Sequence, residues 1–266
     1  MAIKNIIVLV KQVPDTTEIK IDQETGTLIR QGIPSIMNPD DKHGLEQALR
    51  IKEETGAKVT VITMGPPQAD KVLYEALGMG ADKAVHLTDR KFGGADTLAT
   101  SYTITSAIKK LGEFDIIFAG REAIDGDTAQ VGPQIAEQLN IAQVTYVKDF
   151  KLNGDDIVVH RALEDGYFEI KVKTPVLLTV IKDLNEPRYV NMKHLFDAIN
   201  GEGKEIVVWG VDDLDLDLER LGLKGSPTKV FKSFSPTISR EAEMLNGDPS
   251  EQARELKVRL KEKSFI

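Results

Sequence analysis

The stretch of this sequence best suited to chemistry runs from Gly120 to Leu139 and follows the apolar run at 116–119. Its first part is a turn that holds two glycines and three acidic residues. Carboxylate, hydroxyl and amide groups for a ribose or a polar ring come from Asp125, Asp127, Thr128 and Gln130. Gly126 would let the backbone approach a ligand closely. A capped surface turn is the alternative, because neither a P-loop nor a G-x-G-x-x-G motif is present.

The elements around this stretch predict where it lies. An apolar run, a turn, and then Val131, Ile135 and Leu139 at helical spacing predict a strand, a loop and a helix. At the carboxyl end of a parallel strand such a loop opens into a crevice, and the helix points unpaired N–H groups at it. Phosphate groups bind readily at such a helix end, so we expect a nucleotide site.

The first 140 residues alternate between predicted strands and helices. Apolar runs predict strands at 3–10, 59–64, 84–87 and 116–119, separated by helices at 39–54, around 72–77, and at 97–111. Asn38 is expected to cap the first helix and Asp96 the third. This alternation predicts an α/β fold with a doubly wound, mostly parallel, Rossmann-like sheet. Lys11, Met64 and Gly120 would follow three strand ends and share one crevice with Asn38. Lys11 could meet a phosphate or a carbonyl, or remain a solvated lysine.

The pattern changes after Asn140. Alternating runs at 145–147, 157–159, 168–172 and 176–181 predict antiparallel strands that extend or flank the sheet. We expect His160 and Arg161 on an exposed strand face, and a hairpin turn at 22–26 within a polar excursion.

From Asn185 onward the sequence shows few apolar faces. We therefore divide the chain into a nucleotide-binding domain, 1–184, and a long C-terminal arm, 185–266. The arm is either disordered or packed on a partner, with aromatic anchors at Trp209, Phe231, Phe234 and Phe265. Asp248 and Pro249 predict the start of a terminal helix.

Composition excludes several classes of protein. The 266 residues carry a net charge of −8, so a nucleic-acid surface is not expected. The absence of cysteine excludes disulfides, thiolate metal sites and iron–sulfur ligation by this chain, and we expect no metal. Redox chemistry would need a noncovalent cofactor. The first apolar run is too short for a signal peptide and no membrane-length run follows, so we expect a cytoplasmic protein.

Five motifs resemble the beta subunit of an electron-transferring flavoprotein. They are V-K-Q-V-P-D at 10–15, N-P-D-D at 38–41, L-G-M-G-A-D at 77–82, G-R-E-A-I-D-G-D-T-A-Q at 120–130 and N-E-P-R-Y at 185–189. Each is weak alone, but their order and spacing are specific, and the resemblance covers roughly residues 3–192.

The resemblance implies a heterodimer in which the alpha subunit carries a flavin, this chain holds a second nucleotide, and the arm packs on the alpha subunit. The implied cofactor-binding residues are Leu9, Val10, Lys11, Asn38, Pro39, Asp40, Asp41, Met64, Gly120, Arg121, Glu122, Ala123, Ile124, Asp125, Gly126, Asp127, Thr128, Ala129, Gln130 and Val131. No catalytic side chain is implied. The nucleotide is AMP in housekeeping members and a second FAD in electron-bifurcating members.

Two features resemble the bifurcating branch. T-A-Q-V-G-P stands at 128–133 instead of N-Q-T-G, and V-N-M-K-H-L-F-D-A-I follows Tyr189 instead of a lysine-rich run, which changes the expected dehydrogenase contacts. This branch implies that NADH gives a hydride to FAD on this subunit. One electron would then go to ferredoxin or flavodoxin, and the other through the alpha-subunit FAD to an acyl-CoA dehydrogenase such as butyryl-CoA dehydrogenase.

Two alternatives remain at this point. The chain could be a beta subunit that holds AMP as a structural ligand. It could also be a stand-alone adenine-nucleotide sensor, which would need the arm from Asn185 to fold back on its own core.

Overall fold

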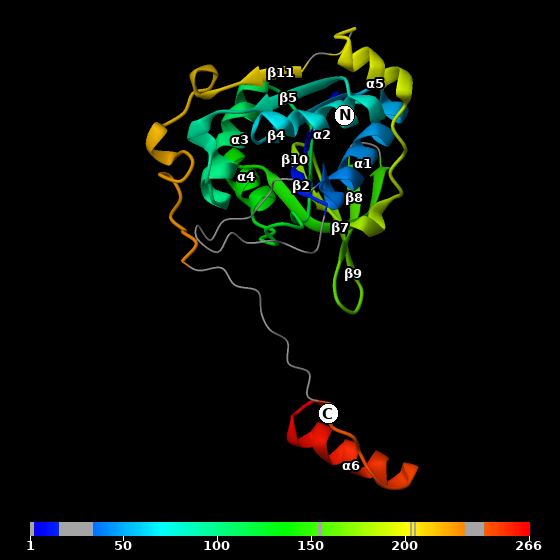
Figure 1. Cartoon of the computed structure of the whole chain (residues 1–266). Helices are drawn as coiled ribbons and strands as arrows, with labels where there is room; N and C mark the ends of the chain where they lie inside the picture. The colour runs from blue at the N-terminus through cyan, green and yellow to red at the C-terminus, as the bar shows by residue number, and fades with distance from the viewer. Residues whose placement is uncertain (1–2, 16–33, 154–155, 203, 205, 232–241) are drawn as a thin grey trace.

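A nine-stranded sheet forms the centre of the computed structural model, which describes residues 3–15, 34–153, 156–202, 204, 206–231 and 242–266 (Figure 1). The strand order is β11-β5-β4-β1-β6-β10-β7-β8-β9. The strands are β1 (Asn5–Leu9), β4 (Lys58–Met64), β5 (Lys83–Leu87), β6 (Ile116–Gly120), β7 (Ala142–Asn153), β8 (Asp156–Ala162), β9 (Tyr167–Val172), β10 (Val176–Val180) and β11 (Ile206–Trp209). A separate antiparallel pair joins β2 (Gln12–Pro14) to β3 (Ser35–Met37). The predicted turn at 22–26 lies outside the described residues.

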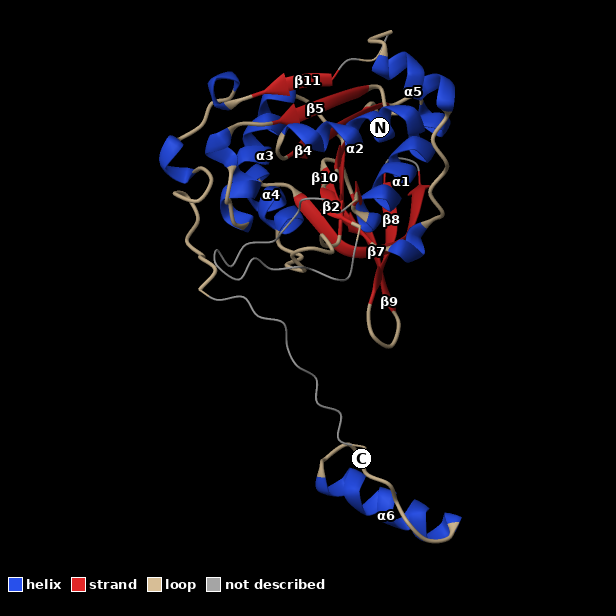
Figure 2. Ribbon diagram, in the orientation of Figure 1, coloured by secondary structure: helices blue, strands red, loops and turns tan. Residues whose placement is uncertain are grey.

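Helices cover both faces of this sheet (Figure 2), which confirms the doubly wound α/β prediction. α1 (Pro39–Thr55) and α2 (Asp70–Met79) pack on one face, with α5 (Met192–Ile199) against α2. α3 (Thr97–Leu111) and α4 (Val131–Leu139) pack on the other. Alternate residues of β1 divide between the two cores, with Ile6 and Val8 facing α1 and Ile7 and Leu9 facing α3. A strand buried on both faces needs the continuous apolar run that β1 has.

One prediction about strand pairing is wrong. β10 is not antiparallel: it pairs parallel with β6 and with the first part of β7. All five of its residues are buried, as expected of a central strand in a parallel sheet. Within the described part of the nine-stranded sheet, antiparallel pairing is confined to the second part of β7, β8 and β9.

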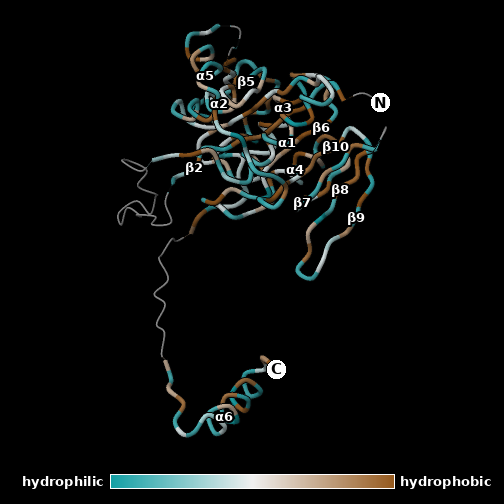
Figure 3. The backbone as a smooth tube through the Cα atoms, turned by 90° about the vertical axis from the view of Figure 1, so that its right-hand side faces the viewer, coloured by the Kyte–Doolittle hydropathy of each residue, from teal (hydrophilic) through white to brown (hydrophobic). Residues whose placement is uncertain are grey.

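β7 bends between its parallel and antiparallel parts. The pairing register shifts opposite Leu178 and Val180, and Tyr146 has a φ of 58°, a left-handed conformation uncommon for a bulky residue. Beyond the bend the strand lies over the α1 face, where the ring of Phe150 is 6.0 Å from that of Phe118. The β8–β9 hairpin projects from the body (Figure 3).

Part of the segment after Asn185 packs on the sheet of this chain, which its sequence did not indicate. β11 pairs parallel with β5 and forms an edge of the sheet, and Trp209 is buried in the core beside α3. Its interpretation as a partner anchor is therefore wrong. Phe231 and Phe265 are exposed, and Phe234 lies outside the described residues.

The terminal helix α6 (Pro249–Glu262) has the predicted cap, in which Asp248 accepts from the amides of Ser250 and Glu251. It lies apart from the sheet (Figure 1). Packing of the arm on a partner stays a prediction. No described helix combines the length and apolar character needed to cross a membrane.

Candidate functional site

The predicted site residues meet where the strand order reverses. β1 has β4 on one side and β6 on the other, so the loops that follow β1 and β6 leave neighbouring strands in opposite directions. In open α/β sheets this switch point is where ligands bind. The loop after β1 begins at Val10, and the loop after β6 is the stretch that was singled out from the sequence.

Asp41 joins the two loops. Its Oδ2 accepts a hydrogen bond from the Lys11 amide at 2.7 Å, and its Oδ1 accepts one from the Gly120 amide at 3.0 Å. Burial raises the pKa of Asp41 to about 7, although hydrogen bonds from Asn38 and the two amides act in the opposite direction. A β-carbon on Gly120 would lie 2.2 Å from Asp41 Oδ1, so only glycine allows α1 to start this close to β6.

Asn38 does not cap α1 as predicted. It occupies the N-cap position, but its side chain makes no hydrogen bond to the first turn. Instead its Nδ2 donates to the Glu122 carbonyl at 2.8 Å, and its Oδ1 accepts from the Ile124 amide at 3.1 Å. Asn38 is fully buried. The donor and the acceptor of its side chain both bind the 120–131 loop, so neither is available to cap α1. The side chain fixes the start of the 120–131 loop.

Two cationic side chains of the site form ion pairs with carboxylates. Lys11 Nζ lies 2.6 Å from Asp125 Oδ1, so Lys11 bridges the loops after β1 and β6 while its side chain remains exposed to solvent. Arg121 lies between two carboxylates: its Nε is 3.6 Å from Asp40 Oδ2, and its Nη2 contacts Glu122. Burial raises the pKa of Asp40, and the charge of Arg121 opposes this rise.

The far end of the loop offers backbone N–H groups. Asp127 and Ala129 have φ values of 46° and 51°, and Gln130, at the N-cap of α4, makes no side-chain bond to the first turn. An uncapped helix start preceded by left-handed residues presents amides suited to phosphate oxygens. The residues present therefore fit the monophosphate or diphosphate group of a nucleotide. Thr97, which the sequence did not single out, donates to Gln130 Oε1 at 2.9 Å.

The remaining predicted residues occupy the same edge in different ways. Leu9 and Val10 are buried at the end of β1, so they can offer only backbone groups to a ligand. Met64 ends β4, next to β1, and its side chain packs partly on the α3 core. Asp127, Thr128 and Gln130 are exposed, and the Asp127 amide donates to the Ala123 carbonyl at 2.9 Å, which closes a turn within the loop. Among the described ranges, no three acidic or histidine side chains gather as they would around a metal.

Comparison with known proteins gives consistent results. Residues 25–214 match the electron transfer flavoprotein domain. An electron transfer flavoprotein subunit beta from Clostridium acetobutylicum is 57% identical over 98% of this chain and 100% of its own length. The caffeyl-CoA reductase-Etf complex subunit CarD of Acetobacterium woodii is 52% identical over 98% of this chain and 99% of its own. The acryloyl-CoA reductase electron transfer subunit gamma of Anaerotignum propionicum is 47% identical over the same shares.

Proposed function

The chain belongs to the electron transfer flavoprotein family as a beta subunit, and from this relationship we propose that its switch-point site binds a second FAD for electron bifurcation. In this proposal NADH is the donor. Ferredoxin or flavodoxin accepts one electron, and an acyl-CoA dehydrogenase accepts the other through the FAD of the alpha subunit. The resemblance of T-A-Q-V-G-P to the bifurcating branch supports this choice over AMP. Two relatives that carry acyl-CoA reductases in their names support the dehydrogenase partner.

The observation that carries the nucleotide proposal is the network of Asn38 and Asp41. Two buried side chains connect the start of α1 to the loops after β1 and β6 by four hydrogen bonds, so the chain's own residues hold the walls of the crevice together. Preformed polar contacts of this kind reduce the ordering cost of binding. We therefore assign the start of α1 a positioning role.

The residues that would hold the nucleotide divide by chemistry. The amides at the start of α4 would receive phosphate oxygens, and Asp127, Thr128 and Gln130 are exposed for ribose or ring contacts. The 120–124 backbone, held by Asn38, would line the adenosine side. When bound, FAD supplies hydride acceptance and one-electron transfer, while this chain supplies position and electrostatics.

The association with other proteins forms a second part of the proposal. The alpha subunit would pack against the arm, where Phe231 and helix α6 have exposed apolar side chains. Tyr189, Met192, Phe196 and Ile199 form a second exposed apolar group around α5, which we assign to the dehydrogenase.

Nucleotide extraction from the complex co-expressed with its alpha subunit tests the proposal. Two FAD per heterodimer, counted by chromatography after denaturation, is the expected result. One FAD and one AMP would refute bifurcation and leave a structural nucleotide. A complex with no nucleotide beyond the alpha-subunit FAD would refute the site itself. As a control, Asp127→Ala should lower the second nucleotide and spare the alpha-subunit flavin, because Asp127 is exposed and lies outside the packed core.

A further inference from the structure

Residues 185–191 form a strap that is fixed at both ends to helices of the body. At its start, His43 Nδ1 lies 2.9 Å from the Asn185 carbonyl oxygen, and Asn185 Nδ2 donates to the His43 carbonyl at 3.0 Å. At its end, the Asn191 amide donates to the Gly78 carbonyl at 3.0 Å. A β-carbon on Gly78 would lie 2.7 Å from a side-chain atom of the strap, so glycine is needed for this close packing on α2.

Arg188, in the middle of the strap, is held by a buried carboxylate of α1. Its backbone amide and its Nε donate to Glu46 Oε2 at 3.1 and 2.8 Å, and its Nη2 donates to Glu46 Oε1 at 3.1 Å. Arg50 Nε donates to the same Oε1 at 2.8 Å. Burial acts to raise the pKa of Glu46, but the hydrogen bonds from Arg188 and Arg50 hold it below its ordinary value. Glu46 is 3% exposed, so it lies too deep to contact a partner protein itself.

Tyr189 projects from this fixed backbone into solvent. Its side chain is 97% exposed, although Glu46 holds the residue before it and α2 holds the end of the strap. Met192 and Phe196 continue the exposed apolar group on α5. Aromatic anchors dominate the binding energy of interfaces, and a backbone that is already ordered reduces the conformational entropy lost on association. The strap therefore presents Tyr189 in a form that is ready to bind.

From this arrangement we infer that Glu46, acting through Arg188, is a positioning residue for association with the dehydrogenase. The inference rests on the proposed function, which assigns the apolar group around Tyr189 to that partner, and it adds the buried group that holds this surface in place. Asp41 precedes Glu46 by less than two turns of α1, so one helix supports both the nucleotide crevice and the strap.

A double-mutant cycle tests whether Glu46 acts through Tyr189. Dissociation constants for butyryl-CoA dehydrogenase are measured by biolayer interferometry on the intact heterodimer, for the wild type, Glu46→Gln, Tyr189→Ala and the double variant. Glu46→Gln keeps the size of the side chain but loses the charge and turns an NH₂ group toward the donors of Arg188. Release of the strap should then raise Kd about tenfold. In the Tyr189→Ala background the same change should raise Kd less than twofold, because the group that Glu46 positions is absent.

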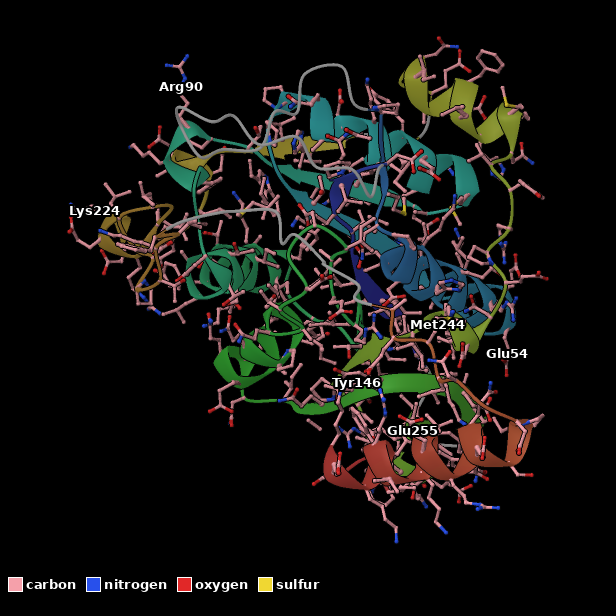
Figure 4. All side chains as sticks on the ribbon, turned by 60° about the horizontal axis from the view of Figure 1, so that its bottom comes forward. Glu54, Arg90, Tyr146, Lys224, Met244 and Glu255 are labelled. Atoms are coloured by element: carbon pink, nitrogen blue, oxygen red, sulfur yellow. The ribbon has the colours of Figure 1, made fainter. Side chains whose placement is uncertain are left out.

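The controls separate loss of docking from loss of the fold. Glu54→Gln removes an exposed charge near the end of the same helix (Figure 4), on the side where α1 borders β7, and should leave Kd unchanged. Nucleotide occupancy of the heterodimer should stay at the wild-type level in Glu46→Gln. Arg188→Lys tests the pair from its other member and should raise Kd less than Glu46→Gln does, because lysine keeps the charge but loses the fork.

Three results would overturn the inference. An equal rise in Kd from Glu46→Gln in both backgrounds would show that Glu46 does not act through Tyr189. Weaker binding by Tyr189→Ala, with Kd unchanged in Glu46→Gln and Arg188→Lys, would leave the docking surface in place and refute the positioning role. A Kd that Tyr189→Ala does not change, or a wild-type heterodimer that does not bind the dehydrogenase, would refute the docking surface itself and the inference with it.

Discussion

Replacing Asn38 by alanine should release the first part of the 120–131 loop without unfolding the subunit. The change removes the acceptor for the Ile124 amide and the donor to the Glu122 carbonyl. Leaving a partly buried polar group without its partner costs about 1–3 kcal/mol. The Ile124 amide should therefore exchange its hydrogen about 5–150 times faster, since each 1.4 kcal/mol is a factor of ten.

Hydrogen exchange followed by mass spectrometry on the heterodimer measures this effect directly. Peptides that cover 120–126 should exchange faster, while those from α3, on the opposite face of the sheet, keep their wild-type rates. Occupancy of the second nucleotide should fall in parallel.

Asn38→Asp is the matched variant. Its carboxylate still accepts from the Ile124 amide but cannot donate to the Glu122 carbonyl, so protection at 124 should persist while the carbonyl contact is lost. Unchanged exchange at 120–126 in Asn38→Ala would refute the positioning role of Asn38. Faster exchange throughout β1 and α1 would show instead that Asn38 supports the whole domain.

Three further predictions concern residues around the site. Gly120→Ala should destabilise the subunit by about 1–3 kcal/mol in urea unfolding, because its β-carbon overlaps Asp41 Oδ1, whereas Gly126→Ala should not, since no atom lies within 4 Å of the added carbon. The pKa of Asp41 lies above its unfolded value, so its contribution to stability is present at low pH and lost as pH rises through about 7. Between pH 5 and 8 the wild type should therefore lose about 2–3 kcal/mol relative to Asp41→Asn in urea unfolding, and parallel pH profiles would contradict this. Arg188→Met should cost about 2–3 kcal/mol in thermal unfolding, because buried Glu46 loses the guanidinium and keeps Arg50 as its charged partner, beside the backbone amide of residue 188. Lys193→Met, which breaks an exposed pair with Asp197, should cost less than about 1 kcal/mol.

The parts of the fold that sequence predicted correctly are those with local signals. The apolar run at 3–10, the cap at Asp96 and the turn-to-helix pattern at 120–139 each depend on neighbouring residues. The structure confirms each element, with the strand itself at 5–9. The loops after β1 and β6 could be placed in one crevice because the alternation of strands and helices fixes which strand ends meet.

The incorrect predictions concern features that depend on contacts with residues distant in the sequence. The apolar sequence of β10 predicts a short strand but does not indicate the direction of its neighbours. Its parallel pairing with β6 could therefore not be predicted from these residues alone. Asn38 has the side chain and position of a helix cap, yet contacts 84 and 86 residues away occupy it. The left-handed Tyr146 follows from the bend of β7 over α1, and no residue type nearby signals it.

The edge position of β11 has a consequence for how the subunit is made. β5 is one of the apolar strands of the sheet, and its outer row of N–H and C=O groups is paired by residues 206–209. An unpaired apolar edge is a template for other chains, so any product that ends before residue 206 would expose β5 to aggregation. During synthesis the same edge stays open until the last fifth of the polypeptide emerges, so chaperone protection matters most for the nearly complete chain. The residues after α5 thus protect the sheet as well as continuing the chain toward the arm.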